Sequence, residues 1–237
     1  MLSGIPTIFG INPYEESSTP EHTLGSIGIT ADGRYFRYAK AGATLVAGDL
    51  LQGPAQTADL SLIPTATAVG AISVTLTTGA AVTANLFADG YLVVSTTAGN
   101  GIYYRIKKHA ATTGAASLVV YLKDPVKVAI TASSTIDLVK NPFNGVVQNP
   151  ATPTSSIVGV ASKAITAAYY GWIQTKGSAA VLAGGNITVG RIVVANIGTA
   201  ASVIAGANAV TEAFPIVGIA QTTIATGEHA TVFLSID

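Results

Sequence analysis

The chain of 237 residues carries 12 Lys and Arg residues and 12 Asp and Glu residues, so its formal net charge at pH 7 is zero. Charged residues make up only 10% of it, whereas an ordinary soluble domain has about 25%. This balance argues against broad electrostatic attraction to nucleic acid or to an anionic membrane, and a surface with little self-repulsion favours association with other subunits. The sequence has no cysteine, which excludes disulfides and thiolate metal sites.

Residues 1–30 differ in composition from the rest of the chain. The stretch INPYEESSTPEHTLGS (11–26) holds three glutamates and two prolines and shows little apolar periodicity. The first ten residues lack the basic and apolar regions of a signal peptide. We predict an extended N-terminal arm, which is ordered only where it lies against another surface; a disordered terminus is the alternative.

From residue 31 onward the pattern predicts β-strands. AISVTLTT (71–78) and ATVFLSID (230–237) alternate apolar and polar residues, and SLVVYL (117–122), GYLVV (90–94) and RIVVAN (191–196) are short β-branched runs. Asp32-Gly33 and Asp89-Gly90 are dipeptides typical of tight hairpin turns. No long stretch has helical periodicity, so we predict a mainly β protein, an antiparallel β-barrel or sandwich.

The sequence also contains internal repeats. VGVASKAITAAYYGWIQT (158–175) aligns without a gap with VGIAQTTIATGEHATVFL (217–234), and residues 35–51 match 170–190 more loosely. Two copies are too few for a solenoid and fit one barrel built from similar hairpins. Prolines gather at 142–153 and indicate a boundary, so we divide the chain into an arm (1–30), a β domain (31–150) and C-terminal β-barrel hairpins (151–237).

The segment GNGIYYRIKKHA (99–110) is the part of the sequence that most resembles a functional patch. Read as a strand, it places Tyr103, Arg105, Lys107 and His109 on one face and apolar residues on the other. A solvated outer face is the first interpretation, and a stripe that binds an acidic protein partner is the second. Nucleic-acid binding is the weakest, because the basic groups are few and no known binding signature accompanies them.

No motif indicates catalysis, a metal or a cofactor. The three histidines are scattered, the Gly-rich stretch AGGNITVG (183–190) lacks the residues of a phosphate loop, and no nucleophile elbow is present. Trp172 is the only tryptophan, and we interpret it as a core or interface anchor. Tyr169, Tyr170 and Trp172 form an aromatic cluster without an obvious carboxylate beside it, so a carbohydrate-binding or hydrolytic protein is the weaker hypothesis. We therefore predict that the protein is not an enzyme and needs no cofactor.

Four stretches of the sequence carry a resemblance to a known class. TLGSIGITADGRYFRYAKAGATLVAGDLLQ (23–52), DGYLVVSTTAGNGIYYRIKKH (89–109), AAYYGWIQTKGSAAVLAGGNITVGRIV (167–193) and VGIAQTTIATGEHATVFLSID (217–237) are similar to virion structural proteins of tailed bacteriophages, and more narrowly to head decoration (cement) proteins. The resemblance implies a β-barrel like that of lambda-type decoration proteins. The chain is longer than those proteins, which an inserted β module over 60–125 would explain.

The resemblance implies a protein that acts by adhesion on the outer surface of the capsid after synthesis in the host cytoplasm. Its expected partners are the major capsid protein and further copies of itself in a homotrimer, with no nucleic acid and no membrane. We expect the protein interface to draw on Tyr14, Glu15 and Glu16 of the arm, on Tyr103, Arg105, Lys107 and His109, and on Trp172. Another virion component, such as a tail tube, fibre or head–tail joining protein, is the alternative.

Overall fold

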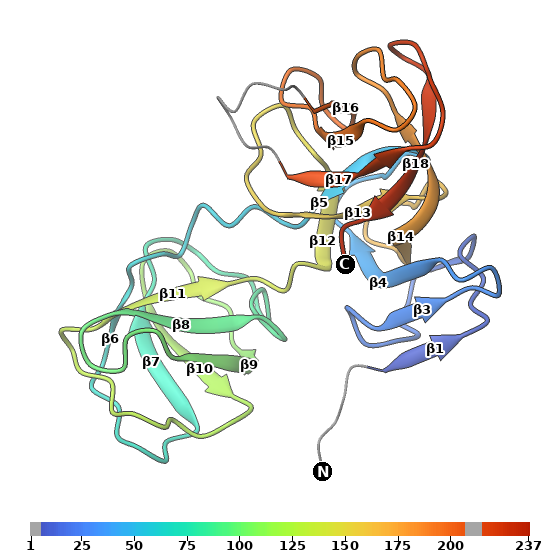
Figure 1. Cartoon of the computed structure of the whole chain (residues 1–237). Helices are drawn as coiled ribbons and strands as arrows, with labels where there is room; N and C mark the ends of the chain where they lie inside the picture. Colours follow the sequence, from blue (N-terminus) through green and yellow to red (C-terminus); the bar gives the residue numbers. More distant parts are fainter. Residues whose placement is uncertain (1–5, 207–214) are drawn as a thin grey trace. The chain divides into compact units, whose positions relative to one another are not determined.

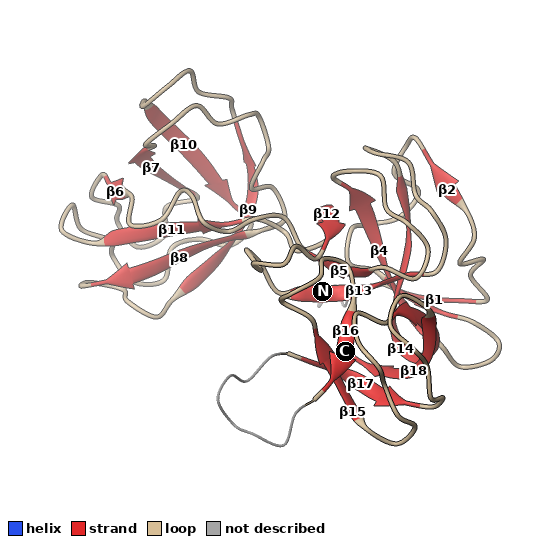
Figure 2. Cartoon of the chain, turned by 90° about the horizontal axis from the view of Figure 1, so that it is seen from above, coloured by secondary structure: helices blue, strands red, loops and turns tan. Residues whose placement is uncertain are grey.

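The computed structural model describes residues 6–206 and 215–237, and all regular structure in these residues is β-strand (Figure 2). The prediction of a mainly β fold is therefore confirmed. The chain divides into two compact units, which we call the split unit (Met1–Pro54 with Pro142–Asp237) and the inserted unit (Ala55–Asn141). Each unit has its own sheet and its own core.

These boundaries differ from the sequence-based ones. The inserted unit extends beyond 60–125 at both ends, and the division expected at residue 150 lies inside the split unit. The difference arises because the proline-rich stretch after residue 141 is not a linker: it contains a strand, Asn144–Gln148, that pairs with two strands of the split unit.

The split unit contains one long, curled sheet (Figure 1). Its strands are β1 (Thr7–Phe9), β2 (Glu16–Ser17), β3 (Ile27–Ile29), β4 (Tyr35–Ala41), β5 (Leu50–Gln52), β12 (Asn144–Gln148), β13 (Ile157–Ala161), β14 (Tyr170–Leu182), β15 (Ile192–Ala195), β16 (Val203–Ala205), β17 (Ile216–Ala220) and β18 (His229–Ser235). The order β4-β12-β5-β13-β14 closes because β14 also pairs with β4, which makes a five-stranded barrel. Its interior is filled by apolar side chains, among them Leu51, Val146, Val158 and Ile173.

Strand β14 is long because it serves two parts of the sheet. Its first half pairs with β4 inside the barrel, and its second half pairs with β18, from which the sheet continues through β17 and β15 to β16. Gly177, at the change of partner, has a φ of +91°, a conformation that other residues adopt only under strain. The register against β4 shifts just before it, between Gln174 and Lys176, so the strand bends here as bulged strands do.

The internal repeats correspond to repeated structure. In each gap-free repeat, a strand leads through an isolated β-bridge to the next strand: β13 to β14 through Ile165, and β17 to β18 through Ile224. Ile165 pairs with Leu45, and Ile224 pairs with Ile187. The first copy belongs to the barrel and the second to the curled sheet beyond it, so the repeats do not build the single barrel that we expected.

The predicted N-terminal arm folds against its own chain. β1 pairs with β3 in parallel, β3 pairs with β4, and β2 pairs with β14. Asp32-Gly33 forms the tight turn between β3 and β4, as predicted, with Gly33 at a φ of +80°. The arm is therefore an outer layer of the split unit, because its short apolar stretches cover the outside of β4 and β14.

The inserted unit is a six-stranded antiparallel sheet that curls on itself (Figure 1). Its strands, in the order of pairing, are β11 (Thr135–Val139), β8 (Tyr91–Thr96), β9 (Tyr103–His109), β10 (Ser117–Leu122), β7 (Ser73–Thr77) and β6 (Ile63–Pro64). A bridge between Leu62 and Ile136 joins the two ends of this order. The predicted hairpin of β8 and β9 is present, and alternate residues of every long strand point into one core around Phe87.

Asp49 is a buried carboxylate immediately before β5, and we expect it to make the stability of the split unit depend on pH. Burial raises the pKa of Asp49, although the hydrogen bond from Gln148 Nε2 and the charge of His229 act in the opposite direction. A raised pKa in the folded state means that the protonated form favours folding. The stabilising contribution is therefore full below the unfolded pKa of about 3.9 and is lost as pH rises through the folded value.

We expect Asp49→Asn to raise the melting temperature at neutral pH, because asparagine can still accept the hydrogen bond from Gln148 without a buried charge. Thermal melts over a pH series check this, and the advantage of the variant should shrink toward pH ~4. Asp124→Asn, at an exposed position, is the matched control. An Asp49→Asn protein that is less stable than the wild type at neutral pH would contradict the predicted direction of the effect.

Candidate interaction sites

The structure places most of the predicted patch on β9 at the surface of the inserted unit. Tyr103 is 64% exposed, and Arg105 and Lys107 are also exposed. The basic character of the patch is reduced, because Asp89 accepts a hydrogen bond from Lys123 and lies 3.7 Å from Arg105 Nη2. The patch is therefore an aromatic surface on which Asp89 partly offsets the charge of Arg105, while Lys107 has no ion pair among the described residues.

His109 does not belong to this surface, contrary to the expectation from alternation. It is only 3% exposed. Between the pair Ile106–Leu122 and the pair His109–Val120, β9 has two residues and β10 has one, which is a β-bulge. The extra residue reverses the alternation, so that His109 points inward like Ile106.

The buried imidazole has a structural role. His109 Nε2 accepts a hydrogen bond from the Phe87 amide at 3.0 Å, and Nδ1 lies 2.8 Å from the Ala110 carbonyl oxygen. Because Nε2 accepts, the proton of the neutral ring is on Nδ1, which donates to Ala110. The ring thereby fixes the loop before β8, and it is not free to contact a partner.

A shallow hollow of about 290 Å³ lies beside the patch, lined by Tyr91, Val93, Tyr103 and Val139. The two tyrosine rings meet edge to face, with centroids 5.4 Å apart. The hollow is almost entirely apolar in its side chains and has no carboxylate or amide in its lining. It can take part in adhesion, but it lacks the polar groups that orient a small ligand.

The second predicted group of residues lies in the split unit, where the structure separates its members. Tyr14 is exposed and lines a different hollow from Glu15 and Glu16. Trp172, which we interpreted as a core or interface anchor, is only 4% exposed and is therefore a core residue of this unit. It packs against Gly28, where an added Cβ would lie 2.7 Å from the indole ring, so the indole is part of the core under β3.

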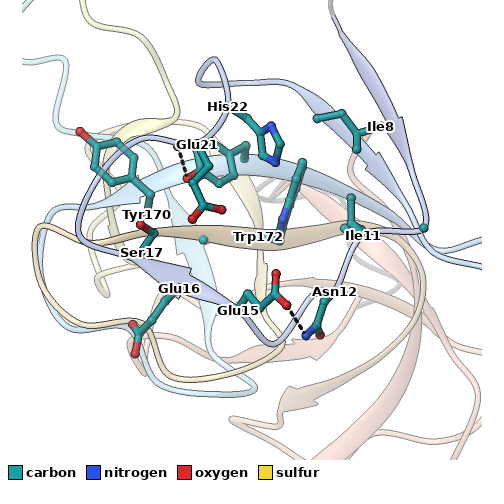
Figure 3. A pocket seen from close by; sticks show the side chains of 13 residues that line it. Ile8, Ile11, Asn12, Glu15, Glu16, Ser17, Glu21, His22, Tyr170 and Trp172 are labelled. Atoms are coloured by element: carbon teal, nitrogen blue, oxygen red, sulfur yellow. Dashed lines mark hydrogen bonds between the residues drawn. The ribbon is translucent and has the colours of Figure 1, made fainter.

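A pocket of about 330 Å³ lies between the N-terminal segment (residues 7–22) and strands β4 and β14 (Figure 3). Its aromatic wall is made of stacked and edge-on rings: Tyr38 lies 5.1 Å from Trp172 and 6.1 Å from Tyr170, measured between centroids. His22 caps this wall, 5.1 Å from Tyr38 and 5.4 Å from Trp172. Burial raises the pKa of Tyr38, whose hydroxyl accepts a hydrogen bond from the Glu21 amide.

Three glutamates, Glu15, Glu16 and Glu21, also line the pocket. Glu15 accepts a hydrogen bond from Asn12 Nδ2 at 2.8 Å (Figure 3). Glu16 accepts one from the Thr166 amide at 2.8 Å and lies 3.5 Å from Lys163 Nζ. The amide hydrogen bond, with the nearby lysine charge, lowers the pKa of Glu16.

The pocket could not be predicted from the sequence, because its parts are far apart in the chain. The aromatic cluster at 169–172 was visible, but the carboxylates beside it come from residues 15–21. Tyr38 and His22 gave no signal as site residues. Pairing of β2 with β14 is what brings these stretches together, and a two-residue strand is too short to be predicted from alternation.

A third surface was not predicted at all. Ile192, Ile219 and Phe233 stand opposite one another on β15, β17 and β18, and each is about half exposed, at 52%, 53% and 46%. We call these three side chains the apolar row. Alternation alone could have indicated Phe233, because Val232 and Leu234 are its inward-facing neighbours.

Comparisons with protein-family models, with curated proteins and with solved structures found no match to this chain. In the part of the chain that the structure describes, no helix is long and apolar enough to cross a membrane. Within the same residues, no three His, Asp or Glu side chains are grouped closely enough to hold a metal ion.

Proposed function

We propose that this chain is a non-enzymatic structural protein of a tailed-bacteriophage virion, which binds the outside of the head shell as a homotrimer and stabilises it. The resemblance of four long stretches to head decoration proteins supports this function, and so does the low, balanced charge. The observation that carries the adhesive part of the proposal is the apolar row on the surface of the split unit.

The apolar row is suited to subunit contact. Neighbouring strands lie about 4.8 Å apart, so the side chains of Ile192, Ile219 and Phe233 adjoin on one face. Burial of the exposed part of each would contribute roughly 1 kcal/mol. Ile192 lies on β15, next to the end strand β16, and Ile219 lies on β17, one strand further in; a partner can approach these exposed side chains without displacing the core.

We expect the purified wild-type protein to sediment as a trimer and to bind undecorated heads. Ile219→Glu should weaken the association about tenfold or more, because a buried unpaired carboxylate costs at least about 1.4 kcal/mol. Val69→Glu, at an isolated exposed apolar residue of the inserted unit, is the matched control and should associate normally. Sedimentation equilibrium measures the formation of the trimer, and a pelleting assay with heads measures binding to the heads.

Three outcomes would count against the proposal. A stable monomer that does not bind heads would remove the adhesive function. Long tubes or rings of the purified protein, seen by electron microscopy, would favour a tail-tube component instead. Equal association of the wild type and Ile219→Glu would show that the apolar row is not the contact.

A further inference from the structure

We propose that the pocket between the N-terminal segment and β14 binds an arginine side chain on an extended peptide segment of a partner protein. This inference is separate from the proposed function. Peptide binding at the pocket can be measured on the isolated chain, whether or not the protein belongs to a virion. The inference depends on three features of the pocket: unbalanced carboxylates, an indole N–H without a partner, and an aromatic wall that is mostly covered.

The residues that line the pocket carry a net negative charge. Its lining includes Glu15, Glu16 and Glu21 and no lysine or arginine. Lys163 pairs with Glu16. Among residues 6–206 and 215–237, neither Glu15 nor Glu21 has an ion pair, and the two carboxylates therefore favour a cationic ligand.

The second feature is the indole N–H of Trp172. The residue is nine-tenths buried and lines the pocket, yet its Nε1 has no hydrogen-bond partner among the described residues. In Figure 3 the nitrogen lies at the end of the ring away from His22. An indole N–H is a donor only, so the group that satisfies it must be an acceptor, such as a peptide carbonyl oxygen.

These two features together define the ligand. A peptide backbone supplies the carbonyl oxygen, and a guanidinium group supplies several donors in a planar fork that suits carboxylates. The guanidinium can also lie against an aromatic ring. Tyr170 is stacked on Tyr38 and has Lys40 Nζ 5.4 Å from its centroid, so the ring that can receive the ligand is the partly exposed His22. Arginine therefore fits better than lysine, whose ammonium group is a compact, strongly hydrated charge.

A glycan fits less well. Carboxylates and an indole N–H can bind hydroxyl groups, but a sugar ring needs a broad, accessible aromatic face. Trp172 and Tyr38 are 4% and 2% exposed, and their faces already contact Gly28, His22 and each other. The pocket offers edges and carboxylates rather than such a platform.

The single tryptophan of the chain makes the test direct, because the only indole N–H resonance in an NMR spectrum comes from the pocket. We expect acetyl-Gly-Arg-Gly-amide to shift this resonance saturably in the full-length protein. Acetyl-Gly-Gln-Gly-amide, which keeps the carbonyl groups but lacks the charge, should bind at least about tenfold more weakly. Added salt should weaken the arginine peptide more than the glutamine peptide.

Variants locate the contact, with calorimetric titration as a readout that does not need the indole. Glu21→Gln should weaken arginine-peptide binding at least about threefold; this side chain has no hydrogen bond or ion pair of its own among the described residues, so the fold should be retained. Glu15→Gln should act in the same direction. Trp172→Phe should weaken both peptides alike, because it removes the N–H donor that the backbone of either peptide would use. Glu228→Gln, at an exposed carboxylate outside the pocket, is the matched control.

The proposal is overturned if the arginine peptide leaves the indole resonance unchanged, or if the two peptides bind equally. Saturable binding of maltotriose without binding of the arginine peptide would identify a glycan pocket instead. Each result is obtained without heads or partner proteins, so a failure here leaves the trimer and head-binding tests unaffected.

Discussion

Removal of residues 55–141, with Pro54 joined to Pro142 through a short Gly-Ser linker, is expected to leave a folded, cooperative split unit. The two ends of the deletion already lie side by side in this unit: a Cβ added to Gly53 would be 2.9 Å from the Pro142 carbonyl oxygen. The strands of the barrel and of the curled sheet all lie outside the deleted range. A short linker therefore closes the gap at little entropic cost.

The matched control is a longer deletion, of residues 55–150, which follows the boundary suggested by the proline-rich stretch. It removes β12, the strand that joins β4 to β5 in the closed barrel. Circular dichroism and urea titration should show a cooperative transition for the first deletion and none for the second. If both proteins are unfolded, or both are folded, the assignment of residues 142–150 to the split unit is wrong.

The largest single-residue effect is expected in the inserted unit, at Leu118. Its side chain is fully buried in the core around Phe87. Truncation of a buried leucine to alanine removes packing and leaves a cavity, at a cost of about 2–5 kcal/mol. Since domains are stable by only about 5–15 kcal/mol, Leu118→Ala should lower the stability of this unit severely.

The next residue in the same strand provides the control. Val119 is exposed on the outer face of β10, and Val119→Ala should change the free energy of unfolding by less than about 0.5 kcal/mol. Urea titration of the isolated segment 55–141 measures both variants against the wild type. Similar losses at the two positions would contradict the inward and outward assignment of the strand.

Much of the fold could be predicted because strand alternation is a local property. Alternation at 71–78 predicted Val74 and Leu76 as inward residues of β7, and the β-branched run at 117–122 predicted the strand β10. Asp32-Gly33 predicted a turn with the left-handed glycine that it needs. The strand order could not be predicted. Closure of the barrel depends on β12, which is parallel to β4 and lies about a hundred residues after it, and no local signal specifies such a partner.

The candidate sites could likewise be predicted only where a local pattern specifies them. Alternation correctly placed Tyr103 and Arg105 outside, but it failed at His109, because a bulge depends on the partner strand and not on the sequence of β9 alone. The acidic pocket combines Trp172 with glutamates about 150 residues earlier. Only the tertiary pairing of β2 with β14 brings them together.

The bent strand β14 also determines how the split unit resists mechanical force. Its first half is hydrogen-bonded on both edges, to β4 and β13, and its second half is hydrogen-bonded to β18. In antiparallel pairs these bonds run perpendicular to the strand, so tension applied along β14 acts on all of them at once in shear. A pull from either end would therefore be distributed over both halves of the sheet before any one pair separates.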